Sequence, residues 1–541
     1  MPEKKFCLTT ARWRSHTISA ASYLGRNFNC RRTIRSMDWL GKFTMESLGV
    51  LSSLFVFMIG LFVLLLIFLF IVDISQTKDA VRRNYPVLGR FRYIFSTLGE
   101  FFRQYFFAMD REEMPFNRAE RDWVYKSSKG VDNTVAFGST RNLSPAGTQI
   151  FVNCPYPTLD EDATETPDVV IGPYSRKPYR AGSLINISGM SFGAISKPAV
   201  LALSRGAKLA GCWYNTGEGG LSPYHLDGGC DIVFQIGTAK YGVRTDDGSL
   251  SDEKLREVAA HEQVKMFELK MSQGAKPGKG GILPSAKVTK EIAKIRGIKA
   301  GHDSISPNRH PEINNNGELL DYINHIRGVT GKPTGFKSVI GAYGWLASLC
   351  EEIHARGIES APDFITIDSG DGGTGAAPMP LIDNVGLPIK EALPIVIDTL
   401  KLYGLRDRVK VIASGKLITP AEVAWAYCAG TDFVVSARGF MFALGCIQAL
   451  KCNKNTCPTG ITTHDRRLQR GLDPEDKARR VKNFAGKIAY GTTLIAHSCG
   501  ADHPRALKRM HVRIVQDNGK SISMDELFPE PEVLPNFRNV A

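Results

Sequence analysis

The sequence predicts an α/β fold, a (β/α)8 TIM barrel preceded by one transmembrane helix. Eight short apolar runs recur after about residue 148, and several are followed by a helical stretch. Runs rich in β-branched and aromatic residues are typical of strands buried on both faces of a parallel sheet. An uncharged stretch between Glu46 and Asp73 predicts the membrane helix.

The chain begins with a basic segment, residues 1–45, which we expect to be poorly ordered. It carries nine Lys and Arg but only two acids, so half of the net charge of +14 precedes the apolar stretch. Basic residues beside a span favour anionic lipid headgroups. A nucleic-acid partner is not expected, because no zinc finger, RRM or basic-helix motif is present.

The transmembrane helix is predicted within residues 46–75. The 25 residues from 48 to 72 are mostly Leu, Phe, Ile and Val. At about 1.5 Å per residue they exceed a hydrocarbon core of roughly 30 Å. A secretory signal would have a shorter apolar region and a cleavage site, so the alternative is a buried helix of a soluble protein. Basic residues on both sides leave the orientation undecided by charge.

Residues 76–147 are predicted to connect the span to the globular part. Residues 93–108 are aromatic and apolar but include Glu100 and Arg103. An amphipathic helix in the membrane interface is therefore favoured over a second span, which would bury both charges. From residue 110 the composition turns polar.

The barrel is predicted at residues 148–500, followed by a C-terminal extension at 501–541. The expected strands are Leu184–Ser188, Trp213–Thr216, Ile232–Ile236, Met266–Lys270, Gly335–Ile340, Phe364–Asp368, Val409–Ala413 and Phe433–Ala437. Helical stretches follow the first, fifth and seventh at Lys197–Ala210, Gly344–Arg356 and Thr419–Ala429. A barrel of this kind carries its site at the carboxyl ends of the strands. The alternative is a doubly wound sheet.

Polar and glycine-rich residues follow the strands, where a barrel would carry its site. Each feature alone is weak, because glycine-rich loops are usually tight turns and a lysine at a strand end is usually solvated. Their recurrence at successive strand ends favours a site. In strand order they are Ser188, Gly189, Met190, Ser191, Glu218, Gln235, Lys270, Lys276, Lys337, Gly372 and Gly373.

The loops after the last two strands have the composition of a phosphate site. They contain Gly415, Lys416, Ala437, Arg438 and Gly439. Barrels commonly hold phosphate there on backbone N–H groups. The phosphate of FMN in this position would place the flavin ring over the barrel mouth. Lys270 or Lys337 would then compensate negative charge near the reduced ring.

Three clustered cysteines, Cys446, Cys452 and Cys457, follow the eighth strand. Such thiolates suit an iron–sulfur cluster or zinc. Structural zinc needs four ligands, and the nearest fourth, His464, lies seven residues after Cys457. Three ligands fit a three-iron cluster, and the remaining alternative is three buried structural cysteines. The eleven cysteines show no disulfide pattern, so we expect a single-pass protein of the cell membrane with its barrel in the reducing cytoplasm.

Five ordered motifs resemble the FMN-binding synthase domain of the glutamate synthase large subunit. They are residues 189–196, 217–220, 273–278, 370–376 and the cysteine segment. The resemblance implies FMN, a 3Fe-4S cluster on the three cysteines, and active-site positions for Glu218, Lys270 and Lys276. It also implies the reaction, in which ammonia adds to 2-oxoglutarate and reduced FMN delivers hydride to 2-iminoglutarate, giving L-glutamate.

The chain departs from the family pattern in two respects. The full-length enzymes carry a glutaminase domain where this chain has its span, so we do not expect it to release ammonia from glutamine by itself. Ile282 stands where the family has a Gln that contributes to 2-oxoglutarate binding, and Lys279 reverses a neighbouring charge. These departures concern the substrate rather than the flavin or the cluster.

Three functional hypotheses follow. The first is a membrane-anchored FMN and 3Fe-4S oxidoreductase of glutamate synthase type, with a 2-oxo acid and ammonia as substrates and ferredoxin or a reductase subunit as electron donor. The second is a membrane-linked flavin dehydrogenase that oxidises an amino or hydroxy acid. The third is an electron-transfer subunit without a substrate of its own.

Overall fold

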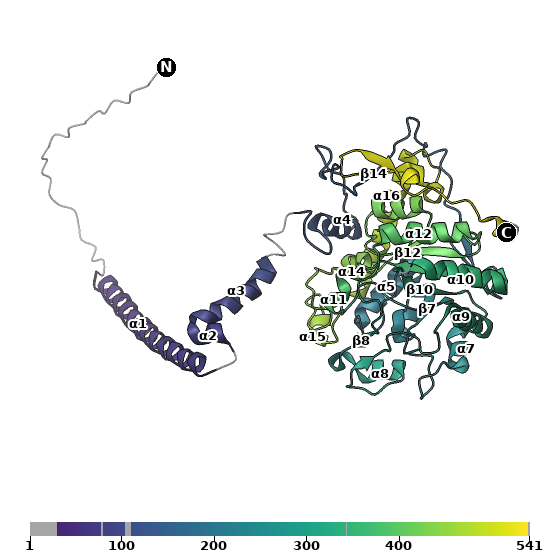
Figure 1. The fold of residues 1–541 in the computed structure, drawn as a ribbon. Coiled ribbons are helices and arrows are strands. Elements are labelled where there is room, and N and C mark those ends of the chain that lie inside the picture. Colours follow the sequence, from purple (N-terminus) through teal and green to yellow (C-terminus); the bar gives the residue numbers. More distant parts are fainter. Residues whose placement is uncertain (1–29, 77–78, 103–109, 342, 539–541) are drawn as a thin grey trace, which may run out of the picture. The chain divides into compact units, whose positions relative to one another are not determined.

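The computed structural model describes residues 30–76, 79–102, 110–341 and 343–538. The chain divides into two compact units, Met1–Ala108 and Met109–Ala541 (Figure 1). The first contains the long apolar helix and two shorter helices, and the second contains the barrel.

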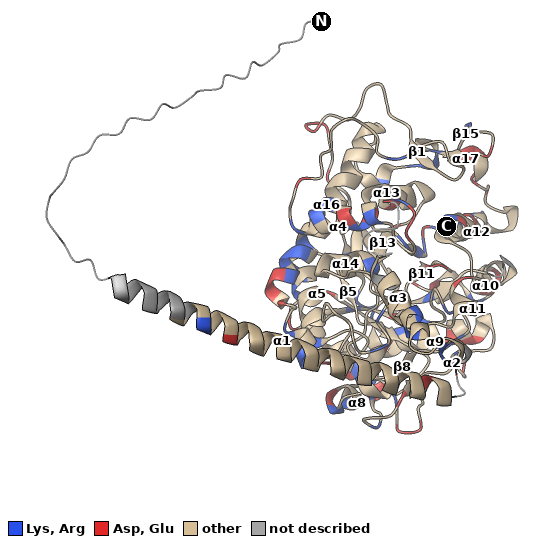
Figure 2. Ribbon diagram, turned by 90° about the vertical axis from the view of Figure 1, so that its left-hand side faces the viewer, with Lys and Arg blue, Asp and Glu red and all other residues tan. Residues whose placement is uncertain are grey.

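The first unit begins with helix α1, Cys30–Ser75. Its part Gly41–Ser75 is, by length and composition alone, apolar enough to cross a membrane, and its most apolar stretch is not covered by protein. Figure 2 shows α1 almost without charged residues along this part. The helix starts inside the segment 1–45 that was predicted to be poorly ordered, because residues 30–45 contain no proline and only Gly41 as a weak helix former. Residues 1–29 lie outside the described part of the chain.

Two shorter helices follow, α2 at Ala80–Asn84 and α3 at Leu88–Phe102. Helix α3 covers the first part of the amphipathic helix predicted at 93–108, and residues 103–108 of that prediction lie outside the described residues.

The second unit contains a closed barrel of eight parallel strands, which confirms the predicted (β/α)8 fold. Each strand coincides with a predicted run to within two residues, because each run is short, apolar and buried on both faces. The strands follow the chain order around the ring. They are β4 Ile185–Ile187, β5 Tyr214–Asn215, β6 Ile232–Ile236, β7 Val264–Lys270, β10 Thr334–Val339, β11 Phe364–Asp368, β12 Lys410–Ser414 and β13 Phe433–Ser436.

Helices surround the barrel (Figure 1). The three helices expected from the sequence are present as α5, α10 and α13. The local reason is clearest in α5, where the Ser196 hydroxyl accepts a hydrogen bond from the Ala199 N–H and Gly211 ends the helix in the left-handed conformation. The main helices are α5 Lys197–Ala210, α7 Asp252–Ala260, α9 Asn316–Thr330, α10 Tyr343–Arg356, α12 Ile389–Leu402, α13 Pro420–Ala429, α14 Arg438–Leu444 and α16 Pro474–Ser498.

Shorter elements shape the carboxyl end of the barrel. Strand β5 leads into the 3-10 turn η2, Gly217–Gly219, and then into α6, Pro223–Leu226. Between β7 and α9 the chain makes a long excursion that contains β8 Ile282–Leu283, α8 Lys290–Arg296 and β9 Ser304–Ile305. Helices α11 Met379–Ile382 and α15 Arg466–Gln469 lie in the later loops.

The segments before and after the barrel pack onto it. A hairpin of β2 Val169–Ile171 and β3 Tyr179–Ala181 adds to the apolar core formed by Trp213, Phe364 and Phe433 inside the ring. Strand β14, Val512–Val515, pairs with β1, Gln149–Phe151, and with β15, Ser521–Ser523. Helix α4, Arg118–Ser128, lies in the predicted connector and donates a hydrogen bond from Tyr125 to the carbonyl of Cys446 at 2.6 Å.

A buried carboxylate holds the amino-terminal side of the barrel together. Asp363, directly before β11, is fully buried and accepts hydrogen bonds from the Arg327 Nε at 2.9 Å and the Thr334 N–H at 2.8 Å. The Arg408 Nη1 lies 3.1 Å from its other oxygen. This position is remote from the strand ends where a barrel carries its site, so we assign the cluster to stability.

We expect Asp363→Ala to lower the free energy of unfolding by about 3–5 kcal/mol, because it leaves two buried guanidinium groups without their counter-charge. Denaturant unfolding of the purified protein in detergent measures this. The exposed Asp517 gives the matched control, and its replacement by Ala should change stability by no more than about 0.5 kcal/mol. Equal stability of the two variants would contradict the assignment.

Candidate active site

The centre of the site is an ion pair at the carboxyl ends of two neighbouring segments. Lys270 ends β7, and its Nζ lies 3.0 Å from the Glu218 Oε1 in the turn η2. The same ammonium donates a hydrogen bond to the Gln273 Oε1 at 2.7 Å. A Cβ added at Gly281 would lie 2.4 Å from the Glu218 Oε1, so a side chain there would displace the carboxylate. Two of the three predicted catalytic residues are therefore in contact.

The third predicted catalytic residue, Lys276, lies within electrostatic reach of this pair. Burial raises the pKa of Glu218, but Lys270, together with Lys276 and Arg296, outweighs this effect and lowers the pKa below its usual value. Burial, and then the charge of Lys270, lowers the pKa of Lys276 to about 8. Glu218 is therefore ionised, whereas Lys276 can gain or lose a proton close to neutral pH.

Arg296, the last residue of α8, is a member of the site that no sequence motif revealed. It is buried, its Nη1 donates to the Ser304 Oγ at 3.0 Å, and its guanidinium lies over the Tyr241 ring at 5.1 Å. Its Nε is buried without a hydrogen-bond partner among the described residues. Such a donor is costly to leave unpaired, so it is available for a bound acceptor.

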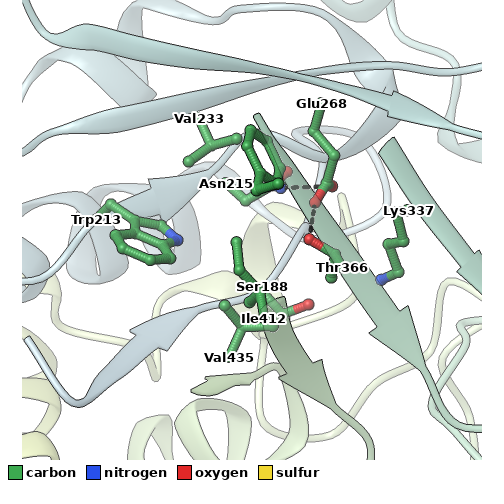
Figure 3. A pocket seen from close by; sticks show the side chains of 10 residues that line it. Ser188, Trp213, Asn215, Val233, Glu268, Lys337, Thr366, Ile412 and Val435 are labelled. Carbon is green, nitrogen blue, oxygen red and sulfur yellow. Dashed lines mark hydrogen bonds between the residues drawn. The ribbon is translucent and has the colours of Figure 1, made fainter. Parts of the chain in front are cut away.

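Below the ion pair, a buried carboxylate organises the barrel interior (Figure 3). Glu268 accepts hydrogen bonds from the Asn215 Nδ2 at 2.8 Å, the Gln235 Nε2 at 2.6 Å and the Thr366 Oγ1 at 2.6 Å. The Asn215 Oδ1 in turn accepts from the Gly217 N–H at 2.9 Å, at the start of the turn that carries Glu218. The network therefore links the barrel core to the position of Glu218.

The predicted residues of the first strand end pack against this network. A Cβ at Gly189 would lie 3.0 Å from the Asn215 Oδ1 and 3.2 Å from the Gln235 Nε2, so only glycine permits this approach. The carbonyl of Met190 accepts a hydrogen bond from the Tyr214 hydroxyl at 2.9 Å. The backbone N of Ser191 lies 2.7 Å from a Cβ built at Gly217. The loop after β4 and the turn after β5 are thus in direct contact.

Ser188 and Lys337 line a cavity of about 10 Å³ in the barrel interior, roughly the size of one water molecule (Figure 3). The Lys337 Nζ lies 3.0 Å from the Asp368 Oδ2. Burial lowers the pKa of Lys337, but Asp368 and Glu268 more than offset this and raise it. Lys337 is therefore a permanent positive charge inside the barrel, held by carboxylates.

The residues predicted to hold a phosphate come together around Asp371. The Lys416 Nζ lies 2.7 Å from the Asp371 Oδ2, and the Arg438 Nη2 donates to the Asp371 carbonyl at 3.2 Å. A Cβ at Gly373 would lie 2.9 Å from the Arg438 Nε, and Gly415 has a φ of +132° and no room for a side chain beside Ser369. Gly372, Ala437 and Gly439 belong to the same loops.

This arrangement fits an anionic group in part. The loops approach closely at Gly372 and Gly415, where an added Cβ would lie 2.7 Å from the Ser369 carbonyl oxygen and 2.2 Å from the Ser369 Cβ. The N–H groups of Gly372 and Gly439 are bonded to the Ser369 carbonyl and the Ser436 hydroxyl, so the side chains of Lys416 and Arg438 are the main candidates for a phosphate. Two cations face one carboxylate, so one positive charge remains for a phosphate. Asp371 was not predicted from the sequence as part of this site. Its ion pair with Lys416 offsets the positive charge of that lysine.

The three cysteines lie in the loop after α14 and form no disulfide. Burial raises the pKa of Cys446 to about 12, and the thiolates of Cys452 and Cys457 contribute to the increase, so the three thiols lie in one electrostatic neighbourhood. In the part of the chain that is described, no three His, Cys, Asp or Glu side chains converge closely enough to hold a single metal ion. The His464 Nε2 lies 2.8 Å from the Gly193 carbonyl, so this nitrogen is already engaged.

Lys287 is a second residue that the sequence reasoning missed. It is almost completely buried, and its Nζ donates to the Ala194 carbonyl at 2.7 Å and to the Cys452 carbonyl at 3.3 Å. Burial lowers its pKa to about 8, although Cys452 and Cys457 act in the opposite direction. It places a positive charge beside two of the three thiols.

Comparisons with known proteins agree with this geometry. Residues 144–502 match the model of a family described as a conserved region in glutamate synthase. The chain is 40% identical over 520 residues to the glutamate synthase large subunit-like protein YerD of Bacillus subtilis (strain 168), covering 88% of this chain and 98% of that protein. The chain is also 34% identical over 351 residues to the archaeal-type glutamate synthase (NADPH) of Thermotoga sp. (strain RQ2). This match spans 64% of the present chain and 65% of the length of the relative.

Among solved structures, a mutant flavocytochrome b2 with pyruvate bound is 12% identical, with a TM-score of 0.42 over 77% of this chain and 89% of that one. A likeness this distant supports no statement about chemistry.

We expect Lys276 to react with an amine-directed acylating reagent near pH 8, because burial and Lys270 lower its pKa to about 8. In Glu218→Gln the reaction should shift to lower pH, since Glu218 is the group that raises this pKa. Peptide mass spectrometry over a pH series measures the midpoint, with the exposed Lys299 as an internal reference. A midpoint that does not move in Glu218→Gln would show that the two side chains do not interact.

Proposed function

The chain belongs to the glutamate synthase family, and we propose on this premise that it is an FMN-dependent oxidoreductase that converts a 2-oxo acid and ammonia into an amino acid. We propose 2-oxoglutarate and L-glutamate as the substrate and product.

The observation that carries the proposal is the positive surplus at the carboxyl end of the barrel. Among the residues of the site described above, six cations stand against four carboxylates. A fifth carboxylate, Glu422, also acts on Arg438, but burial raises the pKa of Glu422 to about 7. A site with this surplus suits an anionic cofactor together with an anionic substrate. The cations are Lys270, Lys276, Arg296, Lys337, Lys416 and Arg438, and the carboxylates are Glu218, Glu268, Asp368 and Asp371.

Arg296 suits a carboxylate of the substrate, and Lys276 suits its reacting carbon–nitrogen bond. The buried Nε of Arg296 has no partner in the described part of the chain, and a carboxylate would supply the missing acceptor. Lys276, with a pKa of about 8, would hold a proton near the carbon–nitrogen bond that is reduced. Glu218, kept ionised by Lys270, would accept a hydrogen bond from the nitrogen that enters the product.

The residues present fit FMN. Arg438, Lys416 and the glycines of their loops would hold its phosphate, while Gln235, Ser188 and Lys337 would lie towards its ring. When bound, FMN supplies the hydride for the substrate. Lys337 would add a fixed positive charge close to the ring, since Asp368 and Glu268 keep it protonated.

We further propose that Cys446, Cys452 and Cys457 bind a 3Fe-4S cluster. The thiolates of such a cluster bind different iron atoms, so they need a shared neighbourhood rather than a single point. The three free thiols meet this condition, and two of them, Cys452 and Cys457, lie near the buried Lys287. The cluster would pass single electrons towards the flavin from a donor such as ferredoxin or a reductase subunit.

The long apolar helix α1 supports anchoring in the cell membrane by one span, with the barrel in the cytoplasm. An unburied apolar helix of this length is otherwise costly in water. The free thiols of the barrel unit favour the reducing side.

One observation favours a second candidate function. Ile282 is 42% exposed in β8, directly after Gly281, which faces Glu218. Ile282 would contact an apolar substituent of a substrate more favourably than it would contact the second carboxylate of 2-oxoglutarate. The alternative is therefore a flavin dehydrogenase that oxidises a different amino or hydroxy acid.

Anaerobically reduced protein should be reoxidised by 2-oxoglutarate with ammonium, as followed by flavin absorbance. Lys276→Met should slow this reaction by about 10²-fold or more, because it removes the proton donor. The wild-type rate should fall as the pH rises through about 8, where the Lys276 ammonium loses its proton.

Lys299→Met provides the control, because this exposed lysine lies outside the site. A purified protein without flavin would contradict the proposal. Reoxidation only by 2-oxo acids with apolar side chains would favour the second candidate.

Replacing Cys452 by Ser should abolish the cluster while flavin is retained, because a hydroxyl is a poor ligand for iron. Iron and acid-labile sulfide content, with low-temperature EPR of the oxidised protein, measures this. Cys350→Ala and Cys428→Ala are matched controls, since both thiols are buried in helices α10 and α13. A cluster that survives Cys452→Ser, or zinc without labile sulfide, would overturn the assignment.

A further inference from the structure

The first unit contains a buried ion cluster directly after its apolar helix. Asp73 has no exposed surface and lies in the last turn of α1. Its oxygens accept hydrogen bonds from the Arg82 Nε and Nη2 at 3.0 and 2.6 Å and from the Arg90 Nε and Nη2 at 2.8 and 2.7 Å. A fifth bond comes from the Val87 N–H at 3.1 Å. Two forked guanidinium groups therefore hold one carboxylate.

The surrounding contacts fix α2 and α3 to this end of α1. The Asp79 Oδ1 caps α2 by accepting from the Val81 and Arg82 N–H groups, and the Tyr93 hydroxyl of α3 donates to the same carboxylate. A Cβ at Gly89 would lie 3.0 Å from the Val81 carbonyl oxygen, so α3 begins in close contact with α2. We name this arrangement, residues 73–76 and 79–93, the Asp73 corner.

The Asp73 corner holds α3 through Arg90 and Tyr93, and residues 91–98 of this helix are exposed. Arg90 and Tyr93, which bind the aspartates, lie on the polar face. The apolar residues recur at intervals of three and four and form a stripe on the opposite face. All of those described are exposed: Leu88 67%, Phe91 48%, Ile94 51%, Phe95 66%, Leu98 41% and Phe102 38%.

We propose that the Asp73 corner lays α3 in the interface of an anionic lipid bilayer, as a second attachment beside the span. The proposal rests on the membrane anchoring by α1 proposed above. Asp73 is the first charged residue after Glu46, so a spanning α1 would place the corner where hydrocarbon meets headgroups. The stripe would then meet acyl chains.

The charge of the corner suits this occupant. Residues 73–92 carry Lys78, Arg82, Arg83, Arg90 and Arg92 against only Asp73 and Asp79. Arg82 and Arg90 are bound to Asp73, whereas Arg83 and Arg92 are exposed and suited to phosphate headgroups. A second protein chain would need no such excess of positive charge, so the bilayer is the favoured partner.

Photo-crosslinking in vesicles tests the proposal with the full chain. The probe p-benzoylphenylalanine replaces Phe95 on the apolar stripe or Thr97 on the polar face, in phosphatidylcholine vesicles with and without phosphatidylglycerol. We expect lipid adducts from position 95 but not from position 97, and more adducts when phosphatidylglycerol is present. Adducts to a second chain at position 95, or equal lipid labelling at both positions, would overturn the proposal.

Asp73→Asn tests the corner itself. It removes the charge that holds both arginines, so lipid labelling at position 95 should fall to the level of position 97 while the protein still floats with the vesicles. Glu46→Gln, an exposed acid on the same helix, should leave the labelling unchanged.

Flotation separates this inference from the anchoring on which it rests. A full chain that floats without lipid adducts at position 95 would overturn only the interfacial placement of α3. A full chain that stays in the soluble fraction would overturn both.

Discussion

Closure of eight parallel strands into one ring brings every carboxyl strand end to the same rim, and charged side chains from distant parts of the chain meet there. Glu218 meets Lys270, Asp368 meets Lys337 and Asp371 meets Lys416, each at 3.0 Å or less. Charges in this partly buried setting must be balanced, because an isolated ion would be costly to bury. A surplus of cations remains at the rim, and our proposed function rests on this surplus.

The barrel interior sets the geometry of this rim through Glu268. The Glu268 carboxylate accepts hydrogen bonds from side chains of β5, β6 and β11. One of these donors, Asn215, also accepts a hydrogen bond from the Gly217 N–H and so fixes the start of the turn η2. The position of Glu218 therefore depends on a buried residue that touches neither it nor Lys270. A change at Glu268 would act on the site by moving the turn, which makes Glu268 a positioning residue in our interpretation.

The strands, and the placement of Glu218 and Lys270 at the rim, were predictable because their signals are local. Each strand is a short apolar run, and Lys270 and Glu218 follow such runs directly, so the barrel topology alone brings them together. Arg296 and Lys287 were not predictable, because they lie in the long segment between β7 and α9. The sequence around them does not indicate which of its residues face the site. The same limit applies to β14, whose partner β1 lies at the other end of the unit. The ion pair of Lys416 with Asp371 joins the loops after β12 and β11, and no sequence motif connects these two loops.

The protein uses its two kinds of basic residue differently. Asp363 at the base of the barrel and Asp73 at the end of α1 are both fully buried, and each is held by two arginines. A guanidinium keeps its charge under all ordinary conditions and binds a carboxylate through a fork, so it suits a fixed structural contact. At the rim and beside the cysteine loop the charged partners are mainly lysines, and burial brings the pKa of both Lys276 and Lys287 to about 8. An amine in this range can change its charge when a substrate or an electron arrives, because each of these events alters the local field. The two fully buried aspartates are thus held by arginines, whereas the two buried groups whose pKa lies near neutrality are lysines.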